Sequence, residues 1–543
     1  MKKRNTMKKV VAKVVGVTLA TVMVAGCLIG CGAGGNGGGA KSNGKSIQIY
    51  AQTNGLGQDW LNNAAKAYRD KTGTEVNVLF DAYISTNIRP TFEAEKAEIA
   101  DLYFIQTGEW RSLFTDGYLE DLTDLMETKG DAGKSLNERM TVDKTWIWND
   151  AGEESQVYVP VTKAPTGIVY NKQMMKVLCQ DILGWEEGHD YPVNTKELKE
   201  VIEALKNINE KGDNKDLFTY NQNGKKMDVK PLVWSGSTGM LEFFTNAWLD
   251  QYWGEKGWEA FYNQVDNCDM LNDEGLYLVY QTMVDLLGLE EDSNGEWISS
   301  TSVPNCVSYN HTSAQSQLLM NHAVMCPTGS WFYSEMKSTI EDVDNLGFMP
   351  VPYLSDDDGN PVTNEGVEMP KTEDGEYANY SRLNTADFFV IPAKASDENK
   401  EEAKAFLQFI FSEEYMPTLQ TDLQAPLCFE FDDSTVEKTA WLKEVDAFVD
   451  KTTNVKSWFG TKTQVYGKIG LYNNPTEAPF SRLSISGFGS SKKLVDSATG
   501  KEINSKEAAT GIAVTENVYN YVFNNYKAAA GAWPSTKEWL ERH

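Results

Sequence analysis

The sequence predicts an α/β fold of mainly parallel sheets flanked by helices, and two observations support this. The first is an alternation of elements. Strands are expected at 46–50, 76–80 and 101–105, with helices at 57–71 and near 91–98 between them. The second is length, because 543 residues are long for one simple domain and favour two or more lobes. Open α/β sheets bind ligands at the carboxyl ends of their strands, so the loops there are candidate binding loops.

The first elements each have a local physical reason. Ile47 and Ile49 alternate with polar residues in the opening strand, as expected for a half-buried strand. The helix at 57–71 has one apolar face, and Gly73 is placed to end it. That face consists of Trp60, Leu61, Ala64, Ala65 and Tyr68.

The rest of the chain continues with the same kinds of element. Extended segments are expected at 156–161 and 167–170, and a helix at 195–206 with Thr195 as its cap. The aromatic-rich segment 242–262 predicts two helices broken near Gly254–Gly257. The remaining predictions are a helix at 313–322, a short apolar run at 323–325, a surface loop at 356–375, a strand at 388–391, a helix capped by Ser396 and a helix at 516–527.

Charge and composition exclude several classes of partner. Fifty Lys and Arg against 78 Asp and Glu give a net charge of −28, which argues against binding to nucleic acid or to anionic lipid. The seven cysteines include no CxxC pair, and the four histidines are scattered. These spacings favour neither a zinc site nor a dense disulfide framework, so we expect no metal and no cofactor.

The amino terminus has the pattern of an export signal. Residues 1–9 are basic, residues 10–25 are apolar apart from Lys13, and small residues with two cysteines follow. The apolar run is short for a transmembrane helix. We therefore expect residues 1–30 to be a signal peptide, followed by a flexible Gly-rich tether at 31–45.

A cysteine directly after a small residue at the cleavage point resembles the lipobox of bacterial lipoproteins, where the thiol is acylated. Cys31 is the preferred lipidation residue, because Leu28 lies three positions before it and the tether follows it. Cys27 is the alternative, and a plain cleaved signal peptide is the other possibility. The lipobox implies a protein held by a lipid anchor at the extracytoplasmic face of a bacterial membrane.

Several short segments then occur in a characteristic order. They are the strands at 47–52 and 100–105, Tyr158-Val159-Pro160 followed by Ile168-Val169-Tyr170-Asn171-Lys172, Ala323-Val324-Met325 followed by Gly329-Ser330-Trp331, and Phe389-Val390-Ile391-Pro392 followed by the helix at 400–411. Together they resemble the family 1 extracellular solute-binding proteins, which are maltose-binding-protein-like capture subunits of ABC importers. The resemblance covers most of residues 46–415.

The resemblance implies a type II periplasmic-binding-protein-like fold, in which two α/β lobes close around a ligand in the cleft between them. It implies an N-terminal lobe of residues 46–163 and 387–425 and a C-terminal lobe of residues 164–386 and 426–543. Chain crossings are expected near 162–165, 384–387 and 421–426. It also implies a monomer without enzymatic activity, with a carbohydrate ligand and permease subunits as partners. The large size of the body for this family favours an oligosaccharide over a monosaccharide.

The resemblance and the strand ends together nominate ligand-binding residues. Trp331 is the strongest candidate, because the matching Trp in the family commonly stacks on the sugar; its alternative is a core role. Trp234 lies where relatives present aromatic residues from the second lobe. Candidates at strand ends and at the first crossing are Gln52, Asn54, Gln106, Glu109, Trp110 and Lys163. Turn formation around Gly55, helix capping by Glu109 and solvent exposure of Lys163 are the alternatives.

Other functions remain open at this point. The same fold could bind a peptide, a polyamine or another non-sugar solute, since amines suit an acidic cleft. A secreted glycoside hydrolase would need two carboxylates at a fixed separation, and no local motif marks such a pair. Residues 356–360 suggest a calcium loop, but placing Gly359 at position 6 leaves Leu354 at position 1, which favours a solvated turn.

Overall fold

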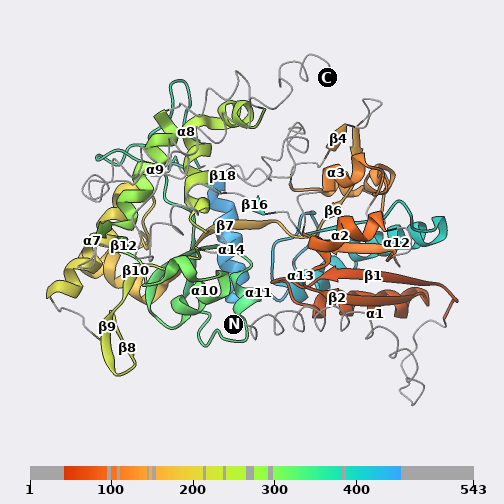
Figure 1. Cartoon of the computed structure of the whole chain (residues 1–543), viewed down its shortest axis with the longest axis horizontal. Helices are drawn as coiled ribbons and strands as arrows, with labels where there is room; N and C mark the ends of the chain where they lie inside the picture. Colours follow the sequence, from red (N-terminus) through yellow and green to blue (C-terminus); the bar gives the residue numbers. More distant parts are fainter. Residues whose placement is uncertain are drawn as a thin grey trace, which may run out of the picture.

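The computed structural model describes residues 42–453, apart from 95–98, 107–109, 131–132, 143–145, 149–153, 212–215, 237–239, 264–273, 292–296, 373–374, 382 and 385–386. It has two lobes connected by extended chain (Figure 1). The predicted signal peptide, both candidate lipidation cysteines, Glu109, Cys268 and the helix predicted at 516–527 lie outside the described residues.

The first lobe is built on a five-stranded sheet with the order β2-β1-β3-β17-β6. Strands β1, β2 and β3 are parallel, whereas β17 runs antiparallel to both β3 and β6. The elements are β1 (Ser46–Gln52), α1 (Asp59–Thr72), β2 (Glu75–Asp81), α2 (Ile84–Glu93), β3 (Leu102–Ile105), α3 (Trp110–Thr115), α4 (Thr123–Glu127), α5 (Leu136–Arg139), β4 (Trp146–Trp148), β5 (Glu154–Gln156), β6 (Val159–Pro160), β17 (Phe388–Val390), α12 (Asp397–Ile410) and α13 (Met416–Leu423).

The second lobe has a sheet with the order β10-β13-β7-β14. Only β10 and β13 are parallel in this order. Its elements are β7 (Ala164–Asn171), α6 (Lys172–Lys176), the π-helix Val177–Ile182, α7 (Thr195–Lys211), β8 (Thr219–Gln222), β9 (Lys225–Asp228), β10 (Lys230–Leu232), α8 (Glu242–Asn263), α9 (Glu274–Leu287), β11 (Leu289–Glu291), β12 (Trp297–Ser299), the 3-10 helix Cys306–Ser308, α10 (His311–Leu319), β13 (Ala323–Gly329), α11 (Phe332–Met336), β14 (Leu346–Met349), β15 (Asn379–Tyr380), β16 (Leu383–Asn384), α14 (Ala440–Lys451) and β18 (Thr452–Thr453).

Most predicted elements are confirmed, with small changes at their ends. Helix α1 buries the predicted apolar face and ends at Gly73, whose φ of 82° places it in the left-handed region. Gly254 breaks α8 with φ 63° and ψ −175°, and Ser396 caps α12 by accepting a hydrogen bond from the Asn399 amide. The predicted loop at 356–375 contains no helix or strand among its described residues.

Three details of the prediction are wrong. The sheets are mixed rather than mainly parallel: in the first lobe β17, which returns from the other lobe, runs antiparallel to β3 and β6, and in the second lobe β7 runs antiparallel to β13 and β14. The second helix, α2 at Ile84–Glu93, begins seven residues before the predicted start at 91, with Ile88 and Phe92 buried one turn apart. Asn194 rather than Thr195 caps α7, since the Glu197 amide donates to Asn194 Oδ1.

The buried side chains fall into groups that follow the two lobes. One group combines residues between 168 and 354 with Trp441, Val445 and Phe448 of α14. The others combine residues between 47 and 161 with residues 388–429. Residues 427–429 pack with this first-lobe core, just beyond the predicted end of the N-terminal lobe at 425.

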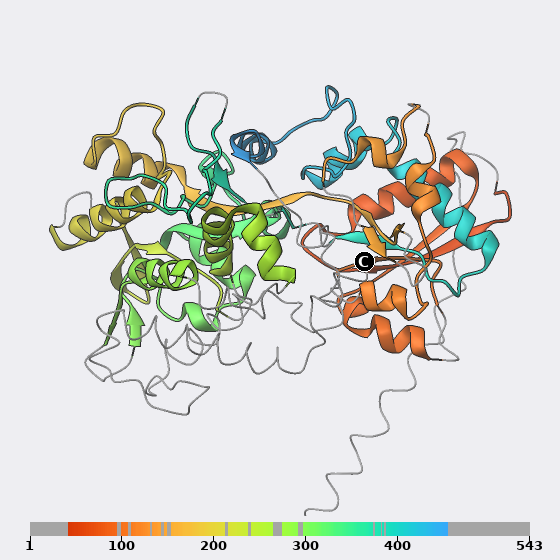
Figure 2. The same cartoon turned by 90° about the horizontal axis from the view of Figure 1, so that it is seen from above.

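Three chain segments lie side by side between the lobes, at the three predicted crossings. The amide of Val161 donates to the Asp387 carbonyl at 3.0 Å, and the amide of Lys163 donates to the Pro426 carbonyl at 3.0 Å. Strand β16 pairs with the start of β7, Leu383 opposite Pro165. The view from above shows β7 running from one lobe to the other (Figure 2). This bundle of extended chain is where a hinge would bend.

Candidate ligand site between the lobes

The first-lobe side of the candidate site lies at the carboxyl ends of neighbouring strands. Asn54 follows β1 and Gln106 follows β3, and both donate side-chain hydrogen bonds to Asp387 Oδ1, at 2.6 Å and 2.7 Å. Asp387 directly precedes the antiparallel strand β17, which places it at the same edge of the sheet. Asn54 is also held by its own turn, since its Oδ1 accepts from the Leu56 amide at 3.0 Å.

Asp387 is a buried carboxyl group, only 6% exposed. Burial raises the pKa of Asp387 to about 6, and the nearby Glu335 carboxylate acts in the same direction. The hydrogen bonds from Gln106 and Asn54 lower the pKa of Asp387 and offset part of that effect. The carboxyl group therefore changes charge close to neutral pH.

Glu335 reaches the same region from helix α11 of the second lobe. Gln315 of α10 donates to Glu335 Oε2 at 2.7 Å, and His311 Nε2 lies 3.5 Å from Glu335 Oε1. Burial raises the pKa of Glu335, while Gln315 and His311 lower it in part. Gly55, next to Asn54, touches this side chain so closely that a Cβ on Gly55 would lie 2.6 Å from Glu335 Cγ. The two lobes thus meet at Gly55 and Glu335.

Trp331 precedes α11 and lies one helical turn before Glu335. Its indole ring covers Gly329, because a Cβ at that position would lie 2.0 Å from Trp331 Cζ3. The ring also meets Phe243 edge to face, with centroids 5.9 Å apart. Trp331 is partly exposed, so its ring is not fully enclosed by the core of the second lobe.

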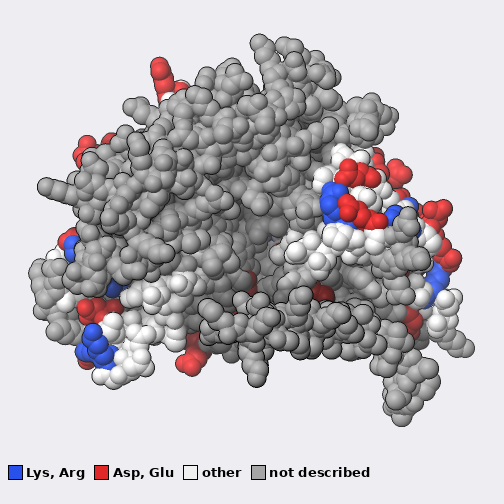
Figure 3. Space-filling view, viewed as in Figure 1, with Lys and Arg blue, Asp and Glu red and all other residues white. Residues whose placement is uncertain are grey.

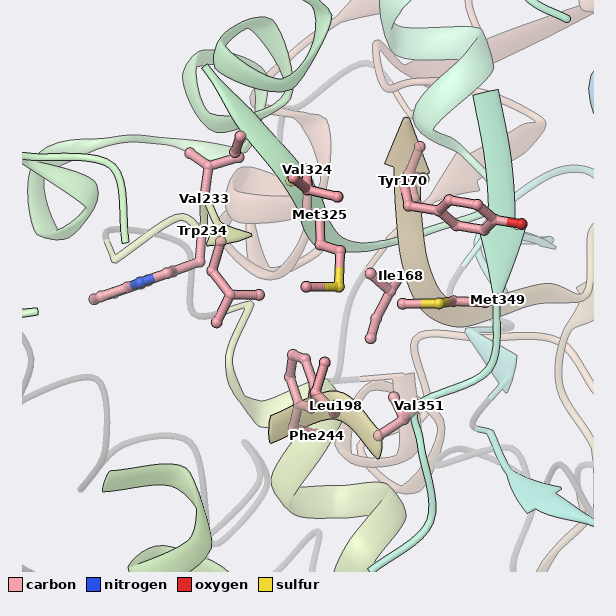
Figure 4. Close-up of a cluster of buried hydrophobic side chains, with 14 of the residues drawn as sticks. Ile168, Tyr170, Leu198, Val233, Trp234, Phe244, Val324, Met325, Met349 and Val351 are labelled. Atoms are coloured by element: carbon pink, nitrogen blue, oxygen red, sulfur yellow. The ribbon is translucent and has the colours of Figure 1, made fainter. Parts of the chain in front are cut away.

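The other two candidate tryptophans are enclosed in the lobe cores. Trp234 is 2% exposed, its Nε1 donates to Ser302 Oγ at 3.0 Å, and Figure 4 shows it with other buried side chains of the second lobe. Trp110 is completely buried, and its ring meets Tyr158 edge to face at 4.9 Å. In the structure both rings belong to buried clusters of their lobes, and ligand contact by either of them stays a prediction.

Gln52 and Lys163 have local roles in the structure. Gln52 Nε2 donates to the Ala82 carbonyl at 2.9 Å, and its Oε1 accepts from the Ser85 amide at 3.0 Å. Gln52 therefore positions the loop after β2. Lys163 is partly buried at the first crossing, where its backbone amide pairs with Pro426. Ligand contact by Gln52, Lys163 and Glu109 stays a prediction.

Sequence reasoning did not single out Asp387, Glu335, Gln315 or His311. The chain has 78 acidic residues, so no local pattern distinguishes two of them. Two weak signals were present. Asp387 ends the predicted crossing 384–387, and Glu335 follows the strongest aromatic candidate, Trp331, by four residues, which is one turn of a helix.

Chemically, these side chains suit a ligand with many hydroxyl groups. Carboxylates accept hydrogen bonds, amides donate and accept, and an aromatic plane packs against apolar C–H faces. Among the described residues, no group of three or more His, Cys, Asp or Glu side chains is arranged to hold a metal ion. Asp356 Oδ1 accepts from the Asp358 and Asn360 amides at 3.0 Å and 2.8 Å, as in the solvated turn that was preferred over a calcium loop.

The four described cysteines, Cys179, Cys306, Cys326 and Cys428, are free and buried. Burial raises the pKa of Cys179 and of Cys306 to about 12, which makes them unreactive. On the described surface, Lys and Arg side chains lie next to Asp and Glu (Figure 3). In the described part of the chain, no helix combines the length and the apolar character that crossing a bilayer requires.

Comparison with known proteins adds the family. Residues 50–417 match the family model described as "Bacterial extracellular solute-binding protein". No curated protein sequence matches the chain.

Solved structures of low sequence identity share the fold. A chitin oligosaccharide binding protein has a TM-score of 0.56 at 14% identity, with 88% of this chain and 99% of that one covered. The apo form of RafE from Streptococcus pneumoniae has a TM-score of 0.55 at 14% identity, covering 90% and 100%. The maltose/maltodextrin-binding domain MalE of Bdellovibrio bacteriovorus, bound to maltotriose, has a TM-score of 0.53 at 14% identity, covering 88% and 99%.

Proposed function

Because the chain belongs to the bacterial extracellular solute-binding proteins, we propose that it captures an oligosaccharide between its two lobes and delivers it to the permease of an ABC importer. The observation that carries the proposal is the polar cluster at the interlobe edge of the first sheet. There Asn54 and Gln106 converge on Asp387, and Glu335 faces them from the second lobe beside Trp331.

This cluster matches what a sugar requires. Sugar hydroxyl groups need donors and acceptors that are already oriented, and the Asn54–Asp387–Gln106 hydrogen bonds orient them before the ligand arrives. A buried polar rim is selective, because a ligand without the right hydroxyl group leaves a site group unpaired. Closure of the lobes would bring the Trp331 surface against the ligand. Binding alone is proposed, with no catalysis.

The proposal includes a lipid anchor at Cys31, which would keep the receptor at the extracytoplasmic face of the membrane. Its support is the basic and apolar amino terminus with its lipobox-like sequence. Mass spectrometry of the mature amino-terminal peptide tests it: a diacylated peptide beginning at Cys31 is expected. An acylated peptide beginning at Cys27 would place the lipid on Cys27 instead of Cys31, and an unmodified terminus would refute the anchor.

The ligand class is tested by thermal shift and isothermal titration of the full chain in detergent, using maltotriose, raffinose, chitotriose, spermidine and a mixed peptide library. A ligand that binds only the folded state raises the melting temperature by mass action. One sugar is expected to do so and to be recovered intact. Asp387→Asn should abolish the shift, while the matched control Asp357→Asn, an exposed acid in a surface turn, should retain it.

Two outcomes would contradict the proposal. A shift with spermidine or peptides, and with none of the sugars, would refute the carbohydrate assignment. Recovery of a hydrolysed sugar would refute binding without catalysis, and the two carboxyl groups with raised pKa, Asp387 and Glu335, would then be the residues to replace.

A further inference from the structure

The strand order of the first lobe arranges the loops at this edge of the sheet in a row. The order β2-β1-β3-β17 places Tyr83, Asn54, Gln106 and Asp387 in succession, because each lies within two residues of the interlobe end of its strand. In Figure 1 the arrow of β1 points toward the second lobe, and the contact of Gly55 with Glu335 places the same end at the cleft. Neighbouring strands lie about 4.8 Å apart, so the backbone at the end of β2 lies about 14 Å from that at Asp387, while the side chains of Asn54 and Gln106 reach across to Asp387. That length exceeds a single hexose ring.

The loop that bears Tyr83 is fixed on both sides. Gln52, at the end of β1, holds it by hydrogen bonds to Ala82 and Ser85. The Ser85 hydroxyl accepts from the Gln106 amide at 2.9 Å, which connects the loop to the end of β3. The Tyr83 amide itself donates to Asp81 Oδ1 at 2.7 Å. Gln106 therefore contacts both this loop and Asp387, and Gln52, which also holds the loop, lies two residues before Asn54.

The Tyr83 side chain is nevertheless left open. It is 67% exposed, more than any other large hydrophobic side chain in the described part of the chain, where Leu79 and Met320 at 50% come next. An aromatic ring on a fixed backbone loses little conformational freedom on binding, and a tyrosine offers an apolar face together with a polar hydroxyl group. Such a ring suits a sugar that extends beyond the buried polar groups.

We propose that Tyr83 forms an outer subsite of the carbohydrate site, where its ring stacks on the second or third sugar unit of an oligosaccharide whose first unit is held at Asp387. This inference rests on the proposed function and deepens it, because it assigns chain-length preference to one residue. The buried end of the row, at Asp387, selects hydroxyl groups. The exposed end, at Tyr83, selects length.

The test is isothermal titration of the full chain in detergent with a chain-length series of whichever sugar type binds: glucose, maltose and maltotriose; galactose, melibiose and raffinose; or N-acetylglucosamine, chitobiose and chitotriose. Tyr83→Ala should weaken trisaccharide binding about three- to tenfold, the range expected for one aromatic contact, and leave the shortest bound sugar within about twofold. Tyr83→Phe should keep the wild-type affinity. Tyr377→Ala removes a 37% exposed tyrosine from the second lobe and is the matched control with no effect.

The outcomes separate this inference from the function on which it rests. If the wild type binds the trisaccharide and Tyr83→Ala binds it equally well, or loses affinity equally for every length, the outer subsite is refuted and the proposed function stands. Binding of the monosaccharide alone also refutes the subsite. If the wild type binds no sugar of any series, the proposed function and the subsite fail together. Because Tyr83 is exposed, the melting temperatures of the variants should match that of the wild type.

Discussion

The two sides of the cleft are built in different ways. On the first-lobe side, the polar groups lie at the ends of strands of one sheet. The Asp387 carboxyl group there accepts hydrogen bonds from two neutral amide groups. On the second-lobe side, Trp331 and Glu335 belong to a five-residue helix and the residue before it, and Glu335 has one amide donor and one histidine beside it. The strand ends supply a fixed polar frame, whereas the short helix supplies the group that meets it across the cleft.

Two tryptophans of the second lobe differ in burial, so their replacement should have different consequences. Trp234→Ala removes an enclosed core ring and should lower the free energy of unfolding by about 3–5 kcal/mol, whereas Trp331→Ala removes a partly exposed ring and should mainly weaken ligand binding. Denaturant melts and titration of each variant measure the two quantities. Trp331→Phe is the control that should retain most of the affinity. A loss of stability at Trp331 equal to that at Trp234 would contradict the contrast.

Asp387→Asn should raise stability while abolishing binding. The folded-state pKa of Asp387 is about 6 and its ordinary value is 3.8, so the folded state binds the proton more tightly. Stability contributed by this group therefore falls as the pH rises from about 4 to about 6, by up to about 3 kcal/mol. Asparagine can still accept from Asn54 and Gln106 and carries no charge.

Melting temperatures of the wild type and of Asp387→Asn between pH 4 and pH 8 test this prediction. The variant should be the more stable protein at pH 7 and above, and the difference should shrink toward pH 4. The pKa of Glu335 is also raised, so the melting temperature of the variant should still fall with rising pH, with a smaller slope than in the wild type. A wild type that is more stable than the variant at pH 8 would show that the buried charge is compensated by groups beyond the two amides.

Gly55→Ala tests the meeting point of the two sides with a smaller change. A methyl group at this position would lie 2.6 Å from Glu335 Cγ, so the Glu335 side chain must move from its place at the cleft, and ligand binding should weaken about tenfold or less. The free energy of unfolding should change little, because the atoms that the new methyl group would contact belong to the other lobe and not to the core of its own lobe. Gly130→Ala, where the nearest atom to the added Cβ is 3.8 Å away, is the matched control. Undiminished affinity in Gly55→Ala would mean that ligand binding does not require this contact.

Two members of the first-lobe cluster, Asn54 and Gln106, could be chosen from sequence because they follow strand ends, whereas Asp387 could not. Asn54 and Gln106 were nominated only because each follows a predicted strand, and the structure brings both to Asp387. Trp110 and Trp234 show the limit of this reasoning. Their types and positions suit a sugar site, yet both rings are buried in the cores. Whether an aromatic ring faces a cleft or a core depends on what packs against it, which local pattern does not contain.

The α/β elements, the helix caps and breaks at Gly73, Gly254 and Ser396, and the resemblance to the family could all be read from local sequence. These depend on residues close together in the chain, through periodicity and backbone conformation. The contacts of Asp387 with Asn54 and Gln106, and of Glu335 with Gly55, depend instead on the folded arrangement of the whole chain. Asp387 and Gln106, for example, are 281 residues apart in the sequence. Such contacts arise because the chain crosses between lobes and returns, so their partners are set by topology rather than by neighbouring sequence.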